Sequence, residues 1–258
     1  MPHLPPGWTA DDVTRELLDA PPRAFAAVPG LEVIDRPDWM QLTCVHFPRG
    51  GLNEVSRSRL SEQNADMTID ATIAHYATRG LTFRWSVTPD ATPSDLAARL
   101  ERRGLRSKPV VAMARSTSME ARALDDIEVL RVGPESIDLL ADVMCEGWGA
   151  PVGAMGDYHR ACLRDPRFAF FIARVNGVAV GGGGAVFFER SVYLLGGVVL
   201  PAFRRRGVYR ALTTARLTAG RELGLLLATT RATADTSAPL LTEQGWDAWF
   251  TFPSFSTR

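Results

Sequence analysis

The chain has little of what metal centres, disulfide frameworks and membrane spans require. Its 258 residues include only three cysteines, Cys44, Cys145 and Cys162, and four histidines, and neither set falls at a metal-ligand spacing. An odd number of cysteines suits a reducing compartment. No apolar run reaches the roughly 18–20 residues that a membrane span needs. We therefore expect no bound metal and no membrane partner.

The chain also lacks a net charge and a targeting segment. Twenty-nine basic residues balance 29 acidic ones, so no overall field recruits nucleic acid. No alternation of basic and aromatic residues suggests a nucleic-acid surface either. The N-terminus, MPHLPPGW, has neither the basic nor the apolar region of a signal peptide. We expect a cytoplasmic protein, with the oligomeric state left open and a homodimer among the options.

Apolar periodicity and turn residues predict a chain of alternating helices and strands. The expected helices are 9–19, 69–80, 94–104, 134–148, 157–165, 207–223 and 237–245. The expected strands are 31–34, 40–47, 81–87, 109–115, 127–132, 168–175, 178–189, 191–200, 224–232 and 246–252, while 53–60 is ambiguous. Asn176-Gly177 predicts a tight hairpin turn, and Glu189-Arg190 a second two-residue loop. This mixture indicates an α/β protein.

A weak internal repeat suggests two related domains. Each half contains, in order, a helix, a glycine, an apolar strand, a turn, a short helix and a second glycine. The two glycines are Gly80 and Gly104 in the first copy and Gly224 and Gly245 in the second. We expect one domain over 1–116, a polar linker over 117–126 and a second domain over 127–258. A chance match of common elements is the alternative.

The segment 198–212, VVLPAFRRRGVYRAL, has the character of an anion site. Pro201 ends a strand, three arginines and Gly207 follow, and a helix begins. The start of a helix offers backbone N–H groups without partners and a partial positive charge, which suit a phosphate. Gly207 lets the backbone pass close to the anion, because it has no side chain. A solvated basic turn is the structural alternative.

This segment resembles the hallmark VxPxx[RQ]xxGx[GA]xxL of the GNAT superfamily of acyl-CoA-dependent N-acyltransferases. The resemblance covers 127–258, while 1–116 resemble a degenerate copy. It implies two GNAT-like domains, each a mixed, mostly antiparallel sheet flanked by helices. It also implies acetyl-CoA or another acyl-CoA as co-substrate, a primary amine of a small molecule or peptide as acceptor, and a set of coenzyme-binding residues. These are Val198, Val199, Leu200, Arg204, Arg205, Arg206, Gly207, Val208, Tyr209, Arg210 and Ser237.

Three positions depart from the family pattern. Tyr209 stands where glycine or alanine is usual, so its side chain must point away from the phosphates. Leu241 stands where many members have a tyrosine that protonates the leaving thiolate, and Gly196-Gly197 where many have a glutamate base. Ser237 and Glu146 are the catalytic candidates that we name in their place. A non-catalytic acyl-CoA-binding sensor or scaffold is therefore the alternative to an enzyme.

Other polar groups near the expected acceptor loops are weaker candidates. Asp157 and His159 lie on a predicted helix, where His159 reads more simply as an exposed residue. Glu189 reads more simply as a charge in the hairpin turn. Tyr193 and Trp148 are more typical of core aromatics than of ligand contacts.

Glycines concentrate in two neighbouring predicted strands. If Glu189-Arg190 is a two-residue loop, Gly182 faces Gly197 and Gly183 faces Gly196. Each glycine weakens a strand by roughly 0.5–1 kcal/mol relative to alanine, so the cluster indicates a gain elsewhere. A ligand that approaches the backbone and a tightly packed contact between helix and sheet are both compatible with it.

Overall fold

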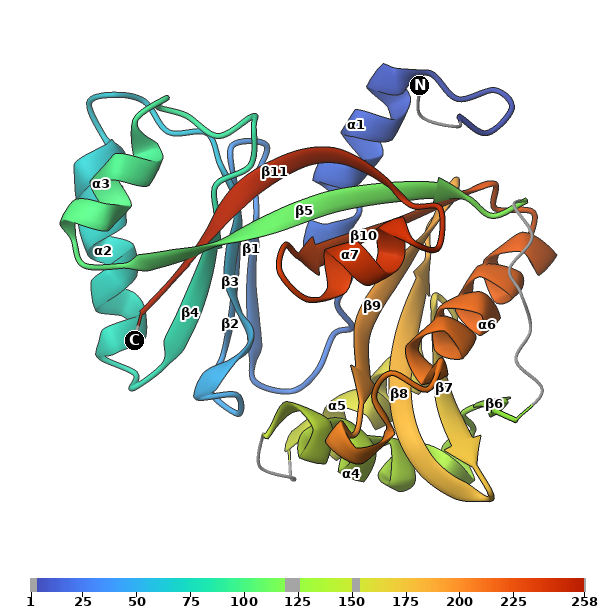
Figure 1. Ribbon diagram of the computed structural model, residues 1–258. Coiled ribbons are helices and arrows are strands. Elements are labelled where there is room, and N and C mark those ends of the chain that lie inside the picture. Colours follow the sequence, from blue (N-terminus) through green and yellow to red (C-terminus); the bar gives the residue numbers. More distant parts are fainter. Residues whose placement is uncertain (1–3, 119–125, 150–153, 258) are drawn as a thin grey trace. The chain divides into compact units, whose positions relative to one another are not determined.

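Helices and strands alternate along the residues that the computed structural model describes, which are 4–118, 126–149 and 154–257 (Figure 1). The helices are α1 Ala10–Asp19, α2 Ala65–Ala77, α3 Leu96–Arg102, α4 Ile137–Trp148, α5 Ala154–Leu163, α6 Val208–Glu222 and α7 Ser237–Thr242. The first strands are β1 Leu31–Asp35, β2 Trp39–Cys44, β3 Arg49–Ser58, β4 Thr82–Ser86, β5 Arg106–Ser116 and β6 Glu128–Arg131. The others are β7 Phe168–Val175, β8 Val178–Phe187, β9 Ser191–Val199, β10 Leu227–Thr233 and β11 Asp247–Ser256. The α/β class is as predicted, and the ambiguous segment 53–60 contributes to β3.

The chain forms two compact units that interleave along the sequence. The N-terminal unit contains Ala27–Ala112, Arg231–Pro239 and Ala248–Arg258. The C-terminal unit contains Met1–Ala26, Met113–Thr230 and Leu240–Asp247. The predicted boundaries differ from these because three strands, β5, β10 and β11, each begin in one unit and end in the other. Most of the predicted linker, at 119–125, lies outside the described residues.

Each unit contains a mixed sheet in which a run of antiparallel strands is followed by one parallel pair. In the N-terminal unit β1, β2 and β3 pair antiparallel, β3 pairs with β4 in parallel, and β11 pairs antiparallel with β4. In the C-terminal unit β6, β7, β8 and β9 pair antiparallel, and β9 pairs with β10 in parallel. Both parallel pairs are crossovers through a helix, α2 in one unit and α6 in the other. The two-domain, mostly antiparallel fold is confirmed.

The repeated glycines adopt the same backbone conformation in both units. Gly80 and Gly104 have φ of +66° and +82°, and their counterparts Gly224 and Gly245 have φ of +76° and +77°. All four lie in the left-handed region that favours glycine, each just beyond a helix. The repeat seen in the sequence therefore corresponds to a repeated helix–strand–helix structure.

Helix α1 belongs to the C-terminal unit, although it starts the chain. Thr9 and Asp12 form a capping box at its start, and Val13 and Leu17 are fully buried. Its Glu16 carboxylate accepts a hydrogen bond from Ser191 at the start of β9. The sequence predicts this helix but not its place, because an amphipathic helix does not reveal which distant surface it covers.

Both hairpin turns next to the glycine-rich strands are confirmed. Asn176 and Gly177 both have positive φ, 51° and 78°, and join Val175 to Val178 in a register pair. The second loop, at Glu189-Arg190, is closed by a hydrogen bond of 2.8 Å from Phe188 N–H to the Ser191 carbonyl.

Helices α4 and α6 cover opposite faces of this hairpin. A Cβ at Gly182 would lie 2.7 Å from Leu140 of α4, and one at Gly183 would lie 3.0 Å from Arg216 of α6. Consecutive strand residues point to opposite faces, so the two helices sandwich the glycines. The close-packing interpretation of these glycines therefore holds on both faces of β8.

His159 of α5 lies in this core, whereas the simplest sequence interpretation placed it on the surface. Its side chain is 2% exposed, and its ring packs edge-on against Phe170 with centroids 4.8 Å apart. Nδ1 has no hydrogen-bond partner among the described residues. Burial lowers the pKa of His159 to about 4, so the imidazole is neutral at physiological pH.

Acid should therefore destabilise the fold through His159. The unfolded chain binds a proton near pH 6.5 and the folded chain only near 4, so stability is lost as the pH falls through this window. At about 1.4 kcal/mol per pH unit, the loss approaches about 3 kcal/mol at pH 4. Urea unfolding from pH 7 to 4 should show a smaller loss in His159→Phe than in the wild type. Equal losses in both proteins would contradict this assignment.

Candidate functional site

The sheet of the C-terminal unit opens between β9 and β10. The parallel ladder joins only three residue pairs, from Ser191 opposite Leu227 to Tyr193 opposite Thr229. Beyond them Thr230 Oγ1 donates a hydrogen bond of 2.9 Å to the Leu194 carbonyl, while β9 continues to Val199. The far half of β9 therefore presents a backbone edge beyond the end of the ladder. Such an edge can pair with an extended ligand as though the ligand were a further strand.

A bulge lies in the same half of β9. Gly184 pairs with Leu195, but Gly182 pairs with Val198, so two residues of β9, Gly196 and Gly197, stand opposite one residue of β8. Gly196 has φ of +48°, a conformation that favours glycine. The predicted pairing of Gly182 with Gly197 is therefore wrong. The predicted register is correct from the hairpin loop to Leu195. Beyond Leu195 the bulge shifts the pairing of β8 and β9 by one residue.

Aromatic side chains flank the bulge on both faces. The Trp148 ring, at the end of α4, lies 3.2 Å from where a Cβ of Gly196 would stand. The Tyr209 ring, in the first turn of α6, lies 2.9 Å from the corresponding point on Gly197. Gly197 itself is exposed, and Trp148 is 45% exposed. Trp148 is thus not the core aromatic that the sequence suggests.

The arginine-glycine loop joins β9 to α6 and has the shape of an anion cradle. After the short turn Pro201–Phe203, Arg205 has φ of 61° and Gly207 has φ of +85°, and α6 begins at Val208. No side chain caps the start of α6. The first N–H groups of the helix are therefore open to an anion.

The arginines of the loop are oriented outward. Arg204, Arg205 and Arg206 are exposed, and Arg210 is partly exposed. Arg204 Nε donates a hydrogen bond of 3.2 Å to the Val199 carbonyl, and the Arg206 guanidinium lies 5.4 Å from the Phe203 ring centre. The loop thus combines several cations with unpaired N–H groups, which is the arrangement that oxygen anions require.

Tyr209 is directed onto the sheet, as the sequence requires if its side chain is to avoid the loop. Its ring rests on Gly197, and the Arg216 guanidinium lies beside it, with Nη2 3.3 Å from where a Cβ of Gly197 would stand. Arg216 is 2% exposed, and burial lowers the pKa of its guanidinium, an effect that Tyr209 partly offsets. No sequence feature singles out Arg216, because an arginine in an amphipathic helix is usually at the surface.

The two candidate catalytic residues differ in their surroundings. Ser237 begins α7, and its Oγ accepts a hydrogen bond of 2.9 Å from Thr233 N–H, so it closes the turn before the helix. Glu146 is an exposed residue in the last turn of α4. Asp157 is also exposed and forms an ion pair with Arg160. Leu241 is 1% exposed, so its side chain fills the core at the position of the expected acid.

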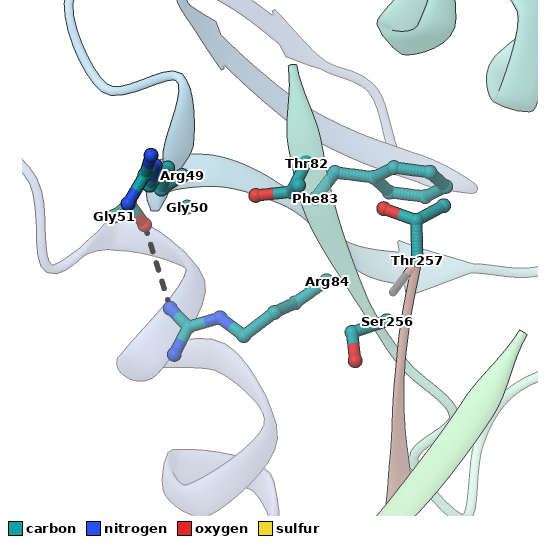
Figure 2. A pocket seen from close by; sticks show the side chains of 8 residues that line it. All are labelled: Arg49, Gly50, Gly51, Thr82, Phe83, Arg84, Ser256 and Thr257. Carbon is teal, nitrogen blue, oxygen red and sulfur yellow. Dashed lines mark hydrogen bonds between the residues drawn. The ribbon is translucent and has the colours of Figure 1, made fainter.

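A second hollow lies in the N-terminal unit. A pocket of about 480 Å³ is lined by residues of β3 and β4 and of the C-terminal strand (Figure 2). Its Arg84 donates hydrogen bonds to the Gly51 carbonyl, at 3.4 Å, and to the Glu54 carboxylate, at 3.1 Å. Because Glu54 neutralises this arginine, the pocket does not repeat the arginine-glycine loop of the other unit.

The opening beyond the β9–β10 ladder, the bulge in β9 and the arginine-glycine loop before α6 all lie within residues 191–230. The sequence model of the Acetyltransferase (GNAT) family matches residues 138–246. The match covers about two fifths of the chain, and most of the matched residues lie in the C-terminal unit, which contains β9, the arginine-glycine loop and α6.

Solved structures share the fold over both units. The GCN5-related N-acetyltransferase from Kribbella flavida has a TM-score of 0.65 and 13% identity, over 97% of this chain and 96% of that one. The GCN5-related N-acetyltransferase from Sphaerobacter thermophilus has a TM-score of 0.62 and 15% identity, over 88% and 75%. A tandem GNAT protein from the clavulanic acid biosynthesis pathway has a TM-score of 0.57 and 13% identity, over 99% and 89%. No curated protein sequence matches the chain.

The two ends of α6 provide a test of the loop. Gly207 before the helix and Gly224 after it both have left-handed φ, +85° and +76°. Alanine costs about 1–2 kcal/mol at either position. Because only Gly207 shapes the loop, Gly207→Ala should weaken coenzyme A binding about tenfold, which is about 1.4 kcal/mol.

Gly224→Ala is the matched control. Its melting temperature should fall by a similar amount, while its coenzyme A affinity, measured by calorimetry, should stay within twofold of the wild type. Equal effects of the two substitutions on affinity would show that the loop does not hold the coenzyme.

Proposed function

We propose that the chain transfers an acetyl or other short acyl group from coenzyme A to a primary amine of a small molecule or peptide. The observation that carries the proposal is the free edge of β9, which leads from the opening at Leu194 to the arginine-glycine loop. One continuous stretch thus offers backbone groups for an extended arm and N–H groups for phosphates. The match of residues 138–246 to the GNAT acetyltransferase family supports transfer of an acyl group from coenzyme A in general.

The residues have distinct roles in this proposal. Backbone groups of Val198 and Val199 pair with the pantetheine arm in the manner of an added strand. Leu200 is less suited to this role, because its N–H donates to the Val180 carbonyl and its carbonyl accepts from Phe203 N–H, both at 2.9 Å. The pyrophosphate lies at the start of α6, where the backbone from Arg204 to Arg210 surrounds it and the arginines supply charge-assisted hydrogen bonds. The thioester then lies at the bulge, between Trp148 and Tyr209.

The chemistry at the bulge requires proton transfer. An alkylamine has a pKa of about 10.4, so it must lose a proton before it attacks the thioester carbon. Carbonyl polarisation by a backbone N–H of the bulge and fixed orientation of the reactants both favour the transition state. Glu146 of the C-terminal unit is a candidate for moving protons, through water where it does not reach the reacting atoms directly. Ser237, the other candidate from the sequence, belongs to the N-terminal unit.

A non-catalytic acyl-CoA-binding protein is the second candidate. The buried Leu241 favours it, because this apolar side chain cannot protonate a thiolate. Glycines at 196 and 197 favour it too, because they supply no carboxylate base. This candidate shares the binding site with the first and differs only in turnover.

Thiol release separates the two candidates. The wild-type chain, mixed with acetyl-CoA and a panel of primary amines and N-terminal peptides, should release free thiol in proportion to amide product. Gly207→Ala should raise the KM for acetyl-CoA without abolishing turnover at saturation. Tight coenzyme A binding without thiol release on the whole panel would contradict the enzyme and favour the sensor or scaffold.

A further inference from the structure

Arg216 is a buried cation without a counter-charge. Its side chain lies in the core between α6 and the glycines of β8 and β9. In the described parts of the chain, no carboxylate contacts it. Its hydrogen bonds go to the Leu212 carbonyl at 3.0 Å, to the Gly184 carbonyl at 3.4 Å and to Thr213 Oγ1 at 3.4 Å. Burying such a charge is costly, and a cost of that kind is commonly retained at functional sites.

The direction of the Arg216 side chain accounts for its contact with Tyr209. Nε–H donates to the carbonyl four residues earlier, so the side chain runs back toward the start of α6. Its Nη2 then lies 3.3 Å from where a Cβ of Gly197 would stand, next to the Tyr209 ring. Glycine at 183 and 197 leaves room for the guanidinium, because any side chain there would meet it.

This contact fixes which way the Tyr209 proton points. The Tyr209 ring and the Arg216 guanidinium lie against the same glycine, 2.9 and 3.3 Å from where a Cβ of Gly197 would stand. A guanidinium has only donors, so toward Arg216 the phenol oxygen can only accept. The phenolic O–H is then free to donate elsewhere. The nearest side chains to Gly196 and Gly197 are Trp148, Met144, Tyr209 and Arg216. Of these four, only the phenol can give up a proton and take it back in a catalytic cycle.

We propose that Tyr209, held by Arg216, is the general acid that protonates the leaving thiolate. This inference rests on the proposed function and supplies the group that is absent at Leu241. The amine nitrogen attacks the thioester carbon, and the tetrahedral intermediate collapses with cleavage of the C–S bond. The electron pair goes to sulfur, which takes the Tyr209 proton to give the thiol. The phenolate recovers, through water, the proton that the amine loses.

In this account Tyr209 is the catalytic residue and Arg216 is a positioning residue. The family pattern has glycine or alanine at position 209. A tyrosine there places its phenol at the bulge, on the face of the sheet that α6 covers. The glycines of β8 and β9 then have two roles. They allow the helices to pack closely on the sheet, and they leave room for the guanidinium that orients the acid.

The test compares single and double variants of the full-length chain in the thiol-release assay. Tyr209→Phe keeps the ring on Gly197 and removes only the hydroxyl, so kcat should fall about 10- to 100-fold, as for loss of a general acid. The KM for acetyl-CoA should stay within twofold. Arg216→Met should lower kcat with little change in KM, and Arg216→Lys should recover part of the loss. The double variant Tyr209→Phe/Arg216→Met should be no slower than Tyr209→Phe, because the two act as a unit.

Tyr76→Phe is the matched control. Its hydroxyl donates to the Leu42 carbonyl in the core of the N-terminal unit, so its loss should lower stability and leave kcat unchanged. Melting temperatures of all variants separate catalytic loss from unfolding. Arg216→Met should melt no lower than the wild type, because it removes an uncompensated buried charge.

The outcomes that overturn each proposal differ. If the wild type turns over and Tyr209→Phe retains its kcat, or changes only KM, Tyr209 is not the acid although the enzyme stands. If losses from Tyr209→Phe and Arg216→Met multiply, Arg216 does not act through Tyr209. If the wild type binds acetyl-CoA and never releases thiol, the proposed function fails and the acid fails with it.

Discussion

The close approach of α4 and α6 to the glycine-rich hairpin of β8 and β9 is the constraint on which the rest of the site depends. Side chains from both helices lie 2.7 to 3.2 Å from where a Cβ would stand at Gly182, Gly183, Gly196 and Gly197. Interior packing tolerates little overlap, so larger residues there would push the helices away. The start of α6 would then move away from the end of β9, and the loop, the bulge and Tyr209 would no longer lie together.

The same constraint relates the unusual residues to one another. Tyr209 replaces a small residue of the family pattern, and it fits because Gly197 offers no side chain. Arg216 can be buried because Gly183 and Gly197 leave space for its guanidinium. Tyr209 and Arg216 are unusual at their positions in the sequence. Glycines some 10 to 30 residues earlier in the chain explain them, because these glycines leave space for both side chains.

Much of the fold follows from the sequence because its signals are local. Asn176-Gly177, the Thr9 cap and the repeated glycines after helices each act on neighbouring residues, and each is found as predicted. The interleaving of the units was not predictable, since which strand pairs with β4 is decided by distant packing. The bulge escaped prediction as well, because a register counted from the hairpin loop carries no sign of an extra residue at Gly196.

The site, too, was predictable from the sequence only in part. The loop from Arg204 to Arg210 has a recognisable sequence, and its left-handed Arg205 and Gly207 give that sequence a physical meaning. The burial of His159 and Arg216 did not show in the sequence, because polar residues are usually exposed and only tertiary packing reverses this. The residues at 196, 197 and 241 indicated only that the usual base and acid are absent from these positions.

Amide hydrogen exchange, with and without coenzyme A, tests the central claim most directly. If the coenzyme lies along the free edge of β9 and on the loop, exchange should slow at residues 196–200 and 204–210. It should stay unchanged in β1 and β2 of the N-terminal unit. Coenzyme A that binds without slowing exchange at β9 and the loop would contradict the account.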